Sequence, residues 1–70
     1  MKGKLVKLNG DWVIRFFDSV NSNTIPLHPL DTKYPSLLAE GSEVEFDIHD
    51  EENNNEGPNR FARILIQHNF

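Results

Sequence analysis

Residues 42–49 read Ser-Glu-Val-Glu-Phe-Asp-Ile-His, and polar and apolar side chains alternate along the whole stretch. The apolar members are Val44, Phe46 and Ile48, and acidic or polar residues stand between them. Successive side chains of a β-strand point to opposite faces of a sheet. The alternation therefore predicts a strand with one buried face and one solvent-exposed, acidic face.

Four other segments also have the composition of strands: residues 2–8, 12–17, 24–29 and 60–67. Asn9-Gly10 predicts a hairpin between the first two, because both residues tolerate positive φ. Pro26 has no backbone N–H, so the third strand is expected at a sheet edge or a bulge. Polar residues 18–23 are expected to form a loop, and residues 50–59, which carry no apolar side chain, a mobile loop.

No segment has a helical apolar period, although residues 30–40 leave room for one short helical turn. Five short strands in 70 residues predict an all-β chain folded as one small barrel over residues 1–70. The strand spacing fits an OB-type barrel and, as the alternative, an SH3-like barrel. The predicted core comprises Val6, Leu8, Trp12, Ile14, Phe16, Ile25, Leu27, Leu38, Val44, Phe46, Ile48, Ala62, Ile64 and Ile66.

Composition limits the possible functions. The chain has no cysteine, which suits a reducing compartment and excludes disulfides and thiolate metal sites. It has no apolar run long enough for a signal peptide or a membrane span, so we expect a cytoplasmic protein without a membrane partner. A core this small makes self-association a reasonable expectation.

Three segments resemble the cold-shock domain, a five-stranded OB barrel that binds single-stranded nucleic acid. These are residues 3–9 (Gly-Lys-Leu-Val-Lys-Leu-Asn), residues 38–48 (Leu-Ala-Glu-Gly-Ser-Glu-Val-Glu-Phe-Asp-Ile), and Gly57-Pro58 followed by Ala62-Arg63-Ile64. The resemblance implies the barrel fold and nucleic-acid binding.

The base-stacking motifs of that family are largely missing. Trp12 takes the first aromatic position of the second strand, but Ile14 takes the second position. In the third strand His28 is retained, whereas prolines stand at positions 26 and 29, where the family has phenylalanine. Stacking contributes roughly 1–3 kcal/mol per base, so the missing rings predict weaker binding.

Two strands are expected to present rings and guanidinium groups on the outer face. With Ile14 and Ile64 facing inward, the outward residues include Arg15, Phe17, Phe61 and Arg63. We predict that this face associates with a protein partner or with a second copy of the chain, because aromatic residues and arginine are common interface anchors. The alternatives are packing of the two rings beneath loops, or single-stranded nucleic-acid binding through Trp12, Arg15, Phe17, His28 and Phe61.

The amino-terminal lysines form the one basic cluster, which is either an electrostatic patch or an ordinary solvated strand face; its members are Lys2, Lys4 and Lys7. His28, His49 and His68 lack the spacing of a metal site, and the acidic residues between 47 and 56 lack the pattern of a calcium loop. No catalytic motif is present. We therefore expect a binding module without catalytic residues, metal or cofactor.

Overall fold

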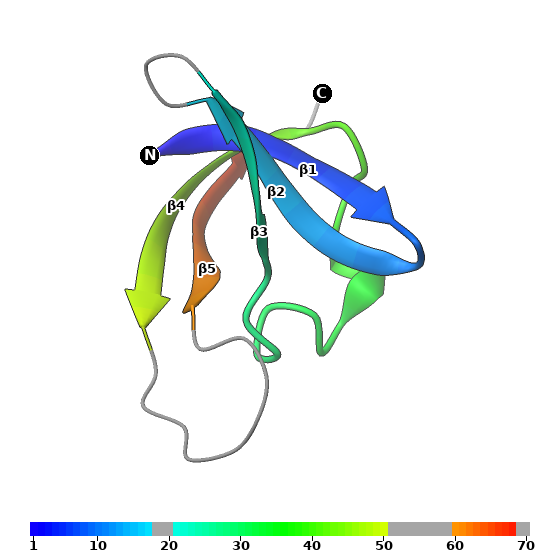
Figure 1. Cartoon of the computed structure of the whole chain (residues 1–70). Coiled ribbons are helices and arrows are strands. Elements are labelled where there is room, and N and C mark those ends of the chain that lie inside the picture. The colour runs from blue at the N-terminus through cyan, green and yellow to red at the C-terminus, as the bar shows by residue number, and fades with distance from the viewer. Residues whose placement is uncertain (18–20, 51–59, 69–70) are drawn as a thin grey trace.

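The computed structural model describes residues 1–17, 21–50 and 60–68, and these residues form an all-β fold. The strands are β1 (Lys2–Leu8), β2 (Asp11–Phe17), β3 (Ser22–Pro26), β4 (Glu43–Asp50) and β5 (Arg60–His68). A single 3-10 turn, η1 (Pro35–Leu37), lies in the long connection between β3 and β4 (Figure 1). The predicted fold class and the predicted helical turn are both confirmed.

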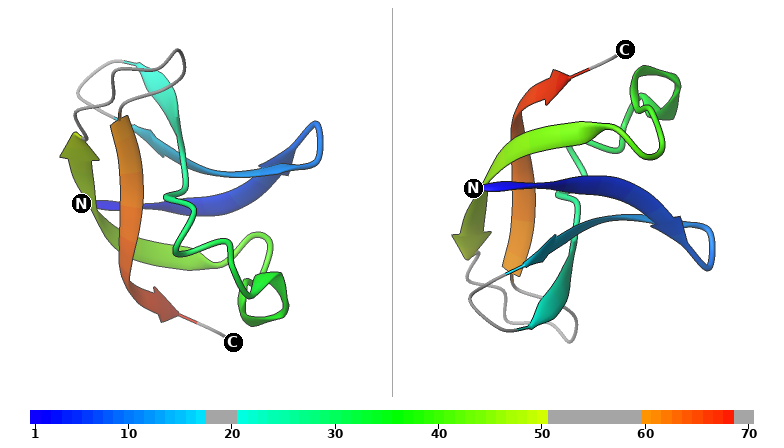
Figure 2. Two further views of the ribbon diagram at one scale, coloured as in Figure 1. Left: turned by 90° about the horizontal axis from the view of Figure 1, so that it is seen from below. Right: turned by 90° about the horizontal axis from the view of Figure 1, so that it is seen from above.

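The five strands form one antiparallel sheet in the order β3-β2-β1-β4-β5. The sheet curls until β5 lies between β4 and the segment that follows β3 (Figures 1 and 2). No continuous ladder closes the described part of the sheet, because the segment after β3 meets β5 at one isolated parallel bridge, between Leu27 and Ala62. β3 and β5 are therefore its edges, and Pro26 lies on an edge strand as predicted.

The β1–β2 hairpin turns at the predicted Asn-Gly pair. Asn9 has a φ of 51° and Gly10 a φ of 86°, the left-handed backbone that a tight two-residue hairpin requires. The tip of this hairpin projects beyond the rest of the sheet (Figures 1 and 2). Leu8, next to the turn, is consequently exposed.

Apolar side chains from all five strands fill the concave side of the sheet. The buried residues are Leu5, Ile14, Ile25, Leu27, Val44, Phe46 and Ala62. Trp12, Phe16, Leu38, Ile48 and Ile64 pack against them and are partly buried. All of these except Leu5 belong to the predicted core.

The prediction for β1 assigned its two faces the wrong way round. Val6 and Leu8 are expected inside, but the fully buried residue is Leu5, which pairs with Ile14 of β2. Val6 and Leu8 place two apolar residues on one face of the strand, whereas Leu5 is the one apolar residue on the other face. The pattern therefore favours the wrong face. Leu5 shares its face with Gly3 and Lys7, neither of which signals a core position.

The prediction for the end of β5 was also wrong. Ile66 is expected inside, but its side chain is 50% exposed. Ile64 and Ile66 lie opposite consecutive residues of β4, which leaves Leu65 as the extra residue of a β-bulge. A one-residue shift reverses the faces of a strand, so Gln67 takes the interior position.

The structure changes the bounds of one predicted loop and describes only the first residue of another. Residues 22 and 23 are expected in a loop, but β3 begins at Ser22 because Phe17 pairs with it across the sheet. The third strand accordingly ends at Pro26 rather than at residue 29. The mobile loop predicted for residues 50–59 lies outside the described residues, apart from Asp50, which ends β4.

Candidate functional site

The outer face of β1 and β2 carries a hollow of about 290 Å³ between cationic side chains. We name this hollow the basic pocket, and its lining residues are Lys2, Gly3, Lys4, Arg15, Phe16, Phe17 and Glu43. Lys4 and Arg15 are direct cross-strand partners, so their charges lie side by side. Like charges directly opposite each other destabilise a sheet. The pocket therefore concentrates positive charge at an energetic cost.

The cations of the pocket differ from the other cations of the chain. Arg60 and Arg63 form ion pairs with Asp50 and Asp31, at 2.8 and 3.1 Å. Lys7 and Lys33 lie over the aromatic rings of Trp12 and Tyr34. Within the described part of the chain, the three lysine and arginine side chains that have neither an ion pair nor a ring contact are Lys2, Lys4 and Arg15.

Two carboxylates on β4 reduce the positive charge. Glu43 is the cross-strand partner of Lys4, and Glu45 is that of Lys2. Glu45 Oε2 lies 3.1 Å from Nε2 of His68, so this carboxylate is already engaged on its far side. Among the described residues that line the pocket, Glu43 is the one acidic residue, so these residues carry an excess of positive charge.

The two adjacent phenylalanines of β2 have different surroundings. Phe16 faces the core, where its ring contacts Phe46 edge to face with centroids 5.4 Å apart. Phe17 faces outward and is 76% exposed. An aromatic ring this exposed is available to stack on a flat partner.

Gly3 allows β1 to lie close to β2 beneath the pocket. A Cβ at this position would lie 2.6 Å from Cγ2 of Ile14 and 2.7 Å from the backbone oxygen of Arg15. Both distances are too short for a real Cβ atom, and because the second contact is with backbone, a side chain at this position would force β1 and β2 to shift. The sequence signal for this role was a glycine inside a strand, which often marks a close approach.

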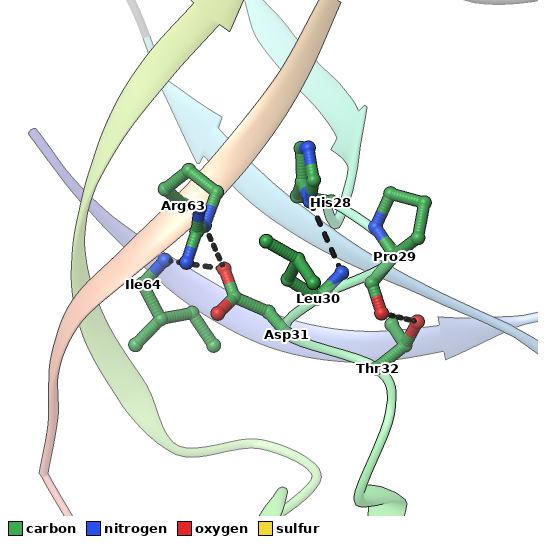
Figure 3. Close-up of polar contacts among 7 residues, drawn as sticks. All are labelled: His28, Pro29, Leu30, Asp31, Thr32, Arg63 and Ile64. Atoms are coloured by element: carbon green, nitrogen blue, oxygen red, sulfur yellow. Dashed lines mark hydrogen bonds and ion pairs between the residues drawn. The ribbon is translucent and has the colours of Figure 1, made fainter.

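A second cluster lies where the two edges of the sheet meet, and we name it the seam; its residues are His28, Asp31, Phe61 and Arg63. The ring of Phe61 contacts the ring of His28 with centroids 5.4 Å apart. The Oδ2 atom of Asp31 accepts hydrogen bonds from Nε of Arg63, at 3.1 Å, and from the backbone N–H of Ile64, at 3.0 Å (Figure 3). These groups are partly buried and join β5 to the connection after β3.

The structure thus divides the predicted outer face into two places. Arg15 and Phe17 line the basic pocket, whereas Phe61 and Arg63 belong to the seam. Phe17 pairs with Ser22, the first residue of β3. Phe61 contacts His28, which lies six positions further along the chain. Six extended residues span roughly 20 Å along the chain, so the two pairs of side chains lie at different places on the sheet.

Trp12 belongs to neither place. Its ring packs against the core, and Nζ of Lys7 lies 5.4 Å from the ring centroid near the hairpin tip. Lys7 therefore lies apart from Lys2 and Lys4, which line the basic pocket. The predicted basic patch is accordingly divided as well.

An exposed ion pair joins the end of β4 to the start of β5. The hydrogen bond from Arg60 lowers the pKa of the exposed Asp50 carboxyl below its usual range, and the same bond raises the pKa of Arg60. Among the described residues, no group of His, Asp and Glu side chains is arranged to hold a metal ion. No helix within these residues is long and apolar enough to cross a membrane.

Sequence reasoning did not identify Asp31 or Glu43 as site residues. Each is an ordinary acidic residue in the sequence, and its role depends on a neighbour far along the chain, Arg63 for the first and Lys4 for the second. No local pattern could have identified either residue.

No protein-family model matches the chain, and no curated protein or solved structure is significantly similar to it. The resemblance to cold-shock domains consequently rests on the quoted residues alone.

Proposed function

We propose that this protein is a non-catalytic binding module and that its basic pocket binds single-stranded nucleic acid. The observation that carries the proposal is the gathering of Lys2, Lys4 and Arg15, which form no ion pair with another described residue, around one hollow beside an exposed ring. Charge for phosphates and a ring for bases are the two elements of sequence-tolerant single-strand binding.

The expected mode of binding follows from the strand register. Lys4 and Arg15 lie opposite each other. They can therefore bind one phosphate from two sides, or each can bind one of two adjacent phosphates. Phe17 is two residues beyond Arg15 on the same face of β2, and there it stacks on a base. A single stacking ring predicts weak binding with little sequence preference.

The arrangement of the strands supports an OB-type barrel as the finer interpretation of the fold. β1 lies in the middle of the sheet, and the edges meet in parallel at Leu27 and Ala62. A partly open five-stranded Greek-key barrel is the architecture of OB-folds. We also propose a cytoplasmic location, where a chain without cysteine needs no disulfide.

The proposed binding is expected to depend on salt concentration. The chain carries a formal charge of -4, so at long range it repels polyanions and the local pocket must supply the attraction. Single-stranded binding weakens with a log–log salt slope of about -0.7 for each cation engaged. Three engaged cations predict roughly a twentyfold loss of affinity between about 50 and 200 mM salt.

Fluorescence anisotropy of a labelled, short oligothymidylate tests this proposal. We expect saturable binding at low salt, the predicted salt dependence, and loss of binding in the triple variant Lys2→Gln/Lys4→Gln/Arg15→Gln. For a control of equal charge, the double variant Lys4→Gln/Arg15→Gln is compared with Lys7→Gln/Lys33→Gln, which changes two cations that contact rings instead. Equal loss in these two double variants would show that net charge, not the pocket, controls binding.

Protein association, including a homo-oligomer, is the second candidate. It is favoured by three apolar side chains of the connection, Leu30, Tyr34 and Leu37, which are all at least 60% exposed around a hollow of about 240 Å³. Exposed apolar side chains that cluster in this way are typical of interaction sites. Sedimentation velocity over a wide concentration range tests self-association, and a constant monomer mass would exclude it.

A further inference from the structure

The free edge of β5 needs protection in a sheet that is not closed. An edge strand presents unpaired N–H and C=O groups that can pair with another chain. β3 reaches β5 at the Leu27–Ala62 bridge, and the backbone N–H of His28 donates to the carbonyl oxygen of Ala62 at 3.0 Å. Beyond Ala62, no strand in the described part of the chain continues this pairing.

The side chain of Asp31 takes over where the backbone pairing stops. Its Oδ2 atom accepts the N–H of Ile64, the next edge-facing residue after Ala62, at 3.0 Å (Figure 3). A neighbouring strand would supply a carbonyl oxygen at this point. The same Oδ2 atom also accepts a hydrogen bond from Nε of Arg63, which holds the carboxylate against β5.

The turn that precedes Asp31 is held by its own hydrogen bonds. The backbone N–H of Asp31 donates to the carbonyl of His28 at 2.8 Å, and the N–H of Leu30 donates to Nδ1 of the His28 ring at 3.0 Å. The hydroxyl of Thr32 donates to the carbonyl of Pro29 (Figure 3), and the N–H of Thr32 donates to the same carbonyl. These hydrogen bonds fix the backbone of residues 28–32, and the fixed backbone holds the Asp31 carboxylate in position.

We propose that Asp31 caps the edge of β5, and that without this cap the edge pairs with the same edge of a second copy of the chain. Two observations identify a second copy as the partner. Leu65 and Ile66, 59% and 50% exposed, follow the capped position and supply an apolar contact for an identical strand. From Phe61 to Gln67 the strand carries one charge, that of Arg63, so little repulsion opposes antiparallel pairing about a twofold axis.

Hydrogen exchange and sedimentation of Asp31→Ala test both parts of the proposal. We expect exchange of the Ile64 amide to accelerate at least about tenfold, because the amide loses its acceptor. We also expect the variant to form a concentration-dependent dimer that wild type does not form through this edge. The control is Asp11→Ala, which removes the same charge at the exposed hairpin and should leave both readouts unchanged.

Two outcomes overturn the proposal. If Ile64 exchanges as slowly in Asp31→Ala as in Asp11→Ala, Asp31 does not cap the edge. If Ile64 exchanges faster but the mass stays that of wild type at every concentration, the edge does not need the cap to stay unpaired.

A second variant and a wild-type measurement cover the case in which Asp31→Ala fails to fold. Asp31→Asn retains an oxygen acceptor but loses the charge that attracts Arg63, so the exchange rate of Ile64 should be intermediate. In the wild-type protein, a scalar coupling through the hydrogen bond should join the Ile64 amide nitrogen to the Asp31 carboxyl carbon. Absence of that coupling, with the Ile64 amide exchanging freely, contradicts the cap directly.

Discussion

The basic pocket and the seam each contain an arginine and a phenylalanine, yet the surroundings of these residues differ. In the seam, Arg63 is hydrogen-bonded to a carboxylate and the ring of Phe61 contacts a histidine. In the pocket, Arg15 has no ion pair among the described residues, and Phe17 is 76% exposed. Engaged groups hold the sheet together, whereas unengaged groups remain available to a ligand. We therefore expect substitutions in the seam to lower stability and substitutions in the pocket to lower affinity.

The largest effect is expected from Gly3→Ala, a substitution in the pocket that should lower both stability and affinity. In Gly3→Ala the new methyl group collides with the Ile14 side chain and the β2 backbone, so we expect a loss of roughly 1–3 kcal/mol of stability. Because the pocket lies on the same two strands, affinity for oligothymidylate should fall as well. Urea denaturation and anisotropy measure the two quantities.

The matched control for this variant is Gly10→Ala. Gly10 has a φ of 86° and open space around its Cβ position, so alanine there strains the turn by roughly 1–2 kcal/mol. That change lies at the hairpin tip and should lower stability without changing affinity. A Gly3→Ala protein as stable as wild type would contradict the close approach of β1 and β2.

A pair of phenylalanine variants separates the regions most cleanly. Phe17→Ala should weaken oligonucleotide binding by about 1–3 kcal/mol, roughly 5- to 150-fold, while stability changes by less than about 0.5 kcal/mol. Phe61→Ala should do the reverse, because its ring packs against His28. If Phe61→Ala reduces affinity and Phe17→Ala does not, the ligand binds at the seam.

Neutralising one pocket cation should have a smaller effect. Lys4→Gln is expected to reduce affinity several-fold at low salt and to make the log–log salt slope less steep by about 0.7. The comparison is Lys33→Gln, whose ammonium group lies over Tyr34 and should not contribute to the slope. An unchanged slope in Lys4→Gln would remove this lysine from the binding surface.

The smallest effect concerns the exposed pair of Asp50 and Arg60. The hydrogen bond from Arg60 lowers the pKa of Asp50 in the folded protein. The contribution of this hydrogen bond to stability is therefore present above the pKa that Asp50 has in the unfolded chain. It is lost as the pH falls through the lower pKa of Asp50 in the folded protein. A carboxyl-detected NMR titration should give Asp50 an ordinary pKa in Arg60→Gln, with affinity for oligonucleotide unchanged. The same low pKa in the variant would contradict the assigned cause.

The fold could be predicted largely because its signals are local. Alternation marked β4, and the Asn9-Gly10 pair marked the first hairpin. Errors arose where a distant partner decides the face of a strand. Leu5 is buried because Ile14 lies opposite it, and the bulge at Leu65 depends on how β5 pairs with β4. Neither pairing is recorded in a single segment of sequence.

The candidate site was less accessible to sequence reasoning for the same reason. The outward direction of Arg15 and Phe17 was predicted from alternation. Their grouping with Phe61 and Arg63 assumed that outward residues of two strands share one surface, but β2 and β5 are not adjacent strands, and β3 lies between them on the side where the sheet curls together. Lys2 and Lys4 join Arg15 instead, because β1 is the strand that pairs with β2.

Chemical-shift mapping with oligothymidylate tests most directly whether the basic pocket is the binding surface. We predict salt-sensitive shifts at the backbone amides of residues 2–4, 15–17 and 43, with no shift at residues 28, 61 and 63. Shifts concentrated at the latter three residues, or no shift at low salt, would contradict the assignment of the basic pocket as a nucleic-acid site.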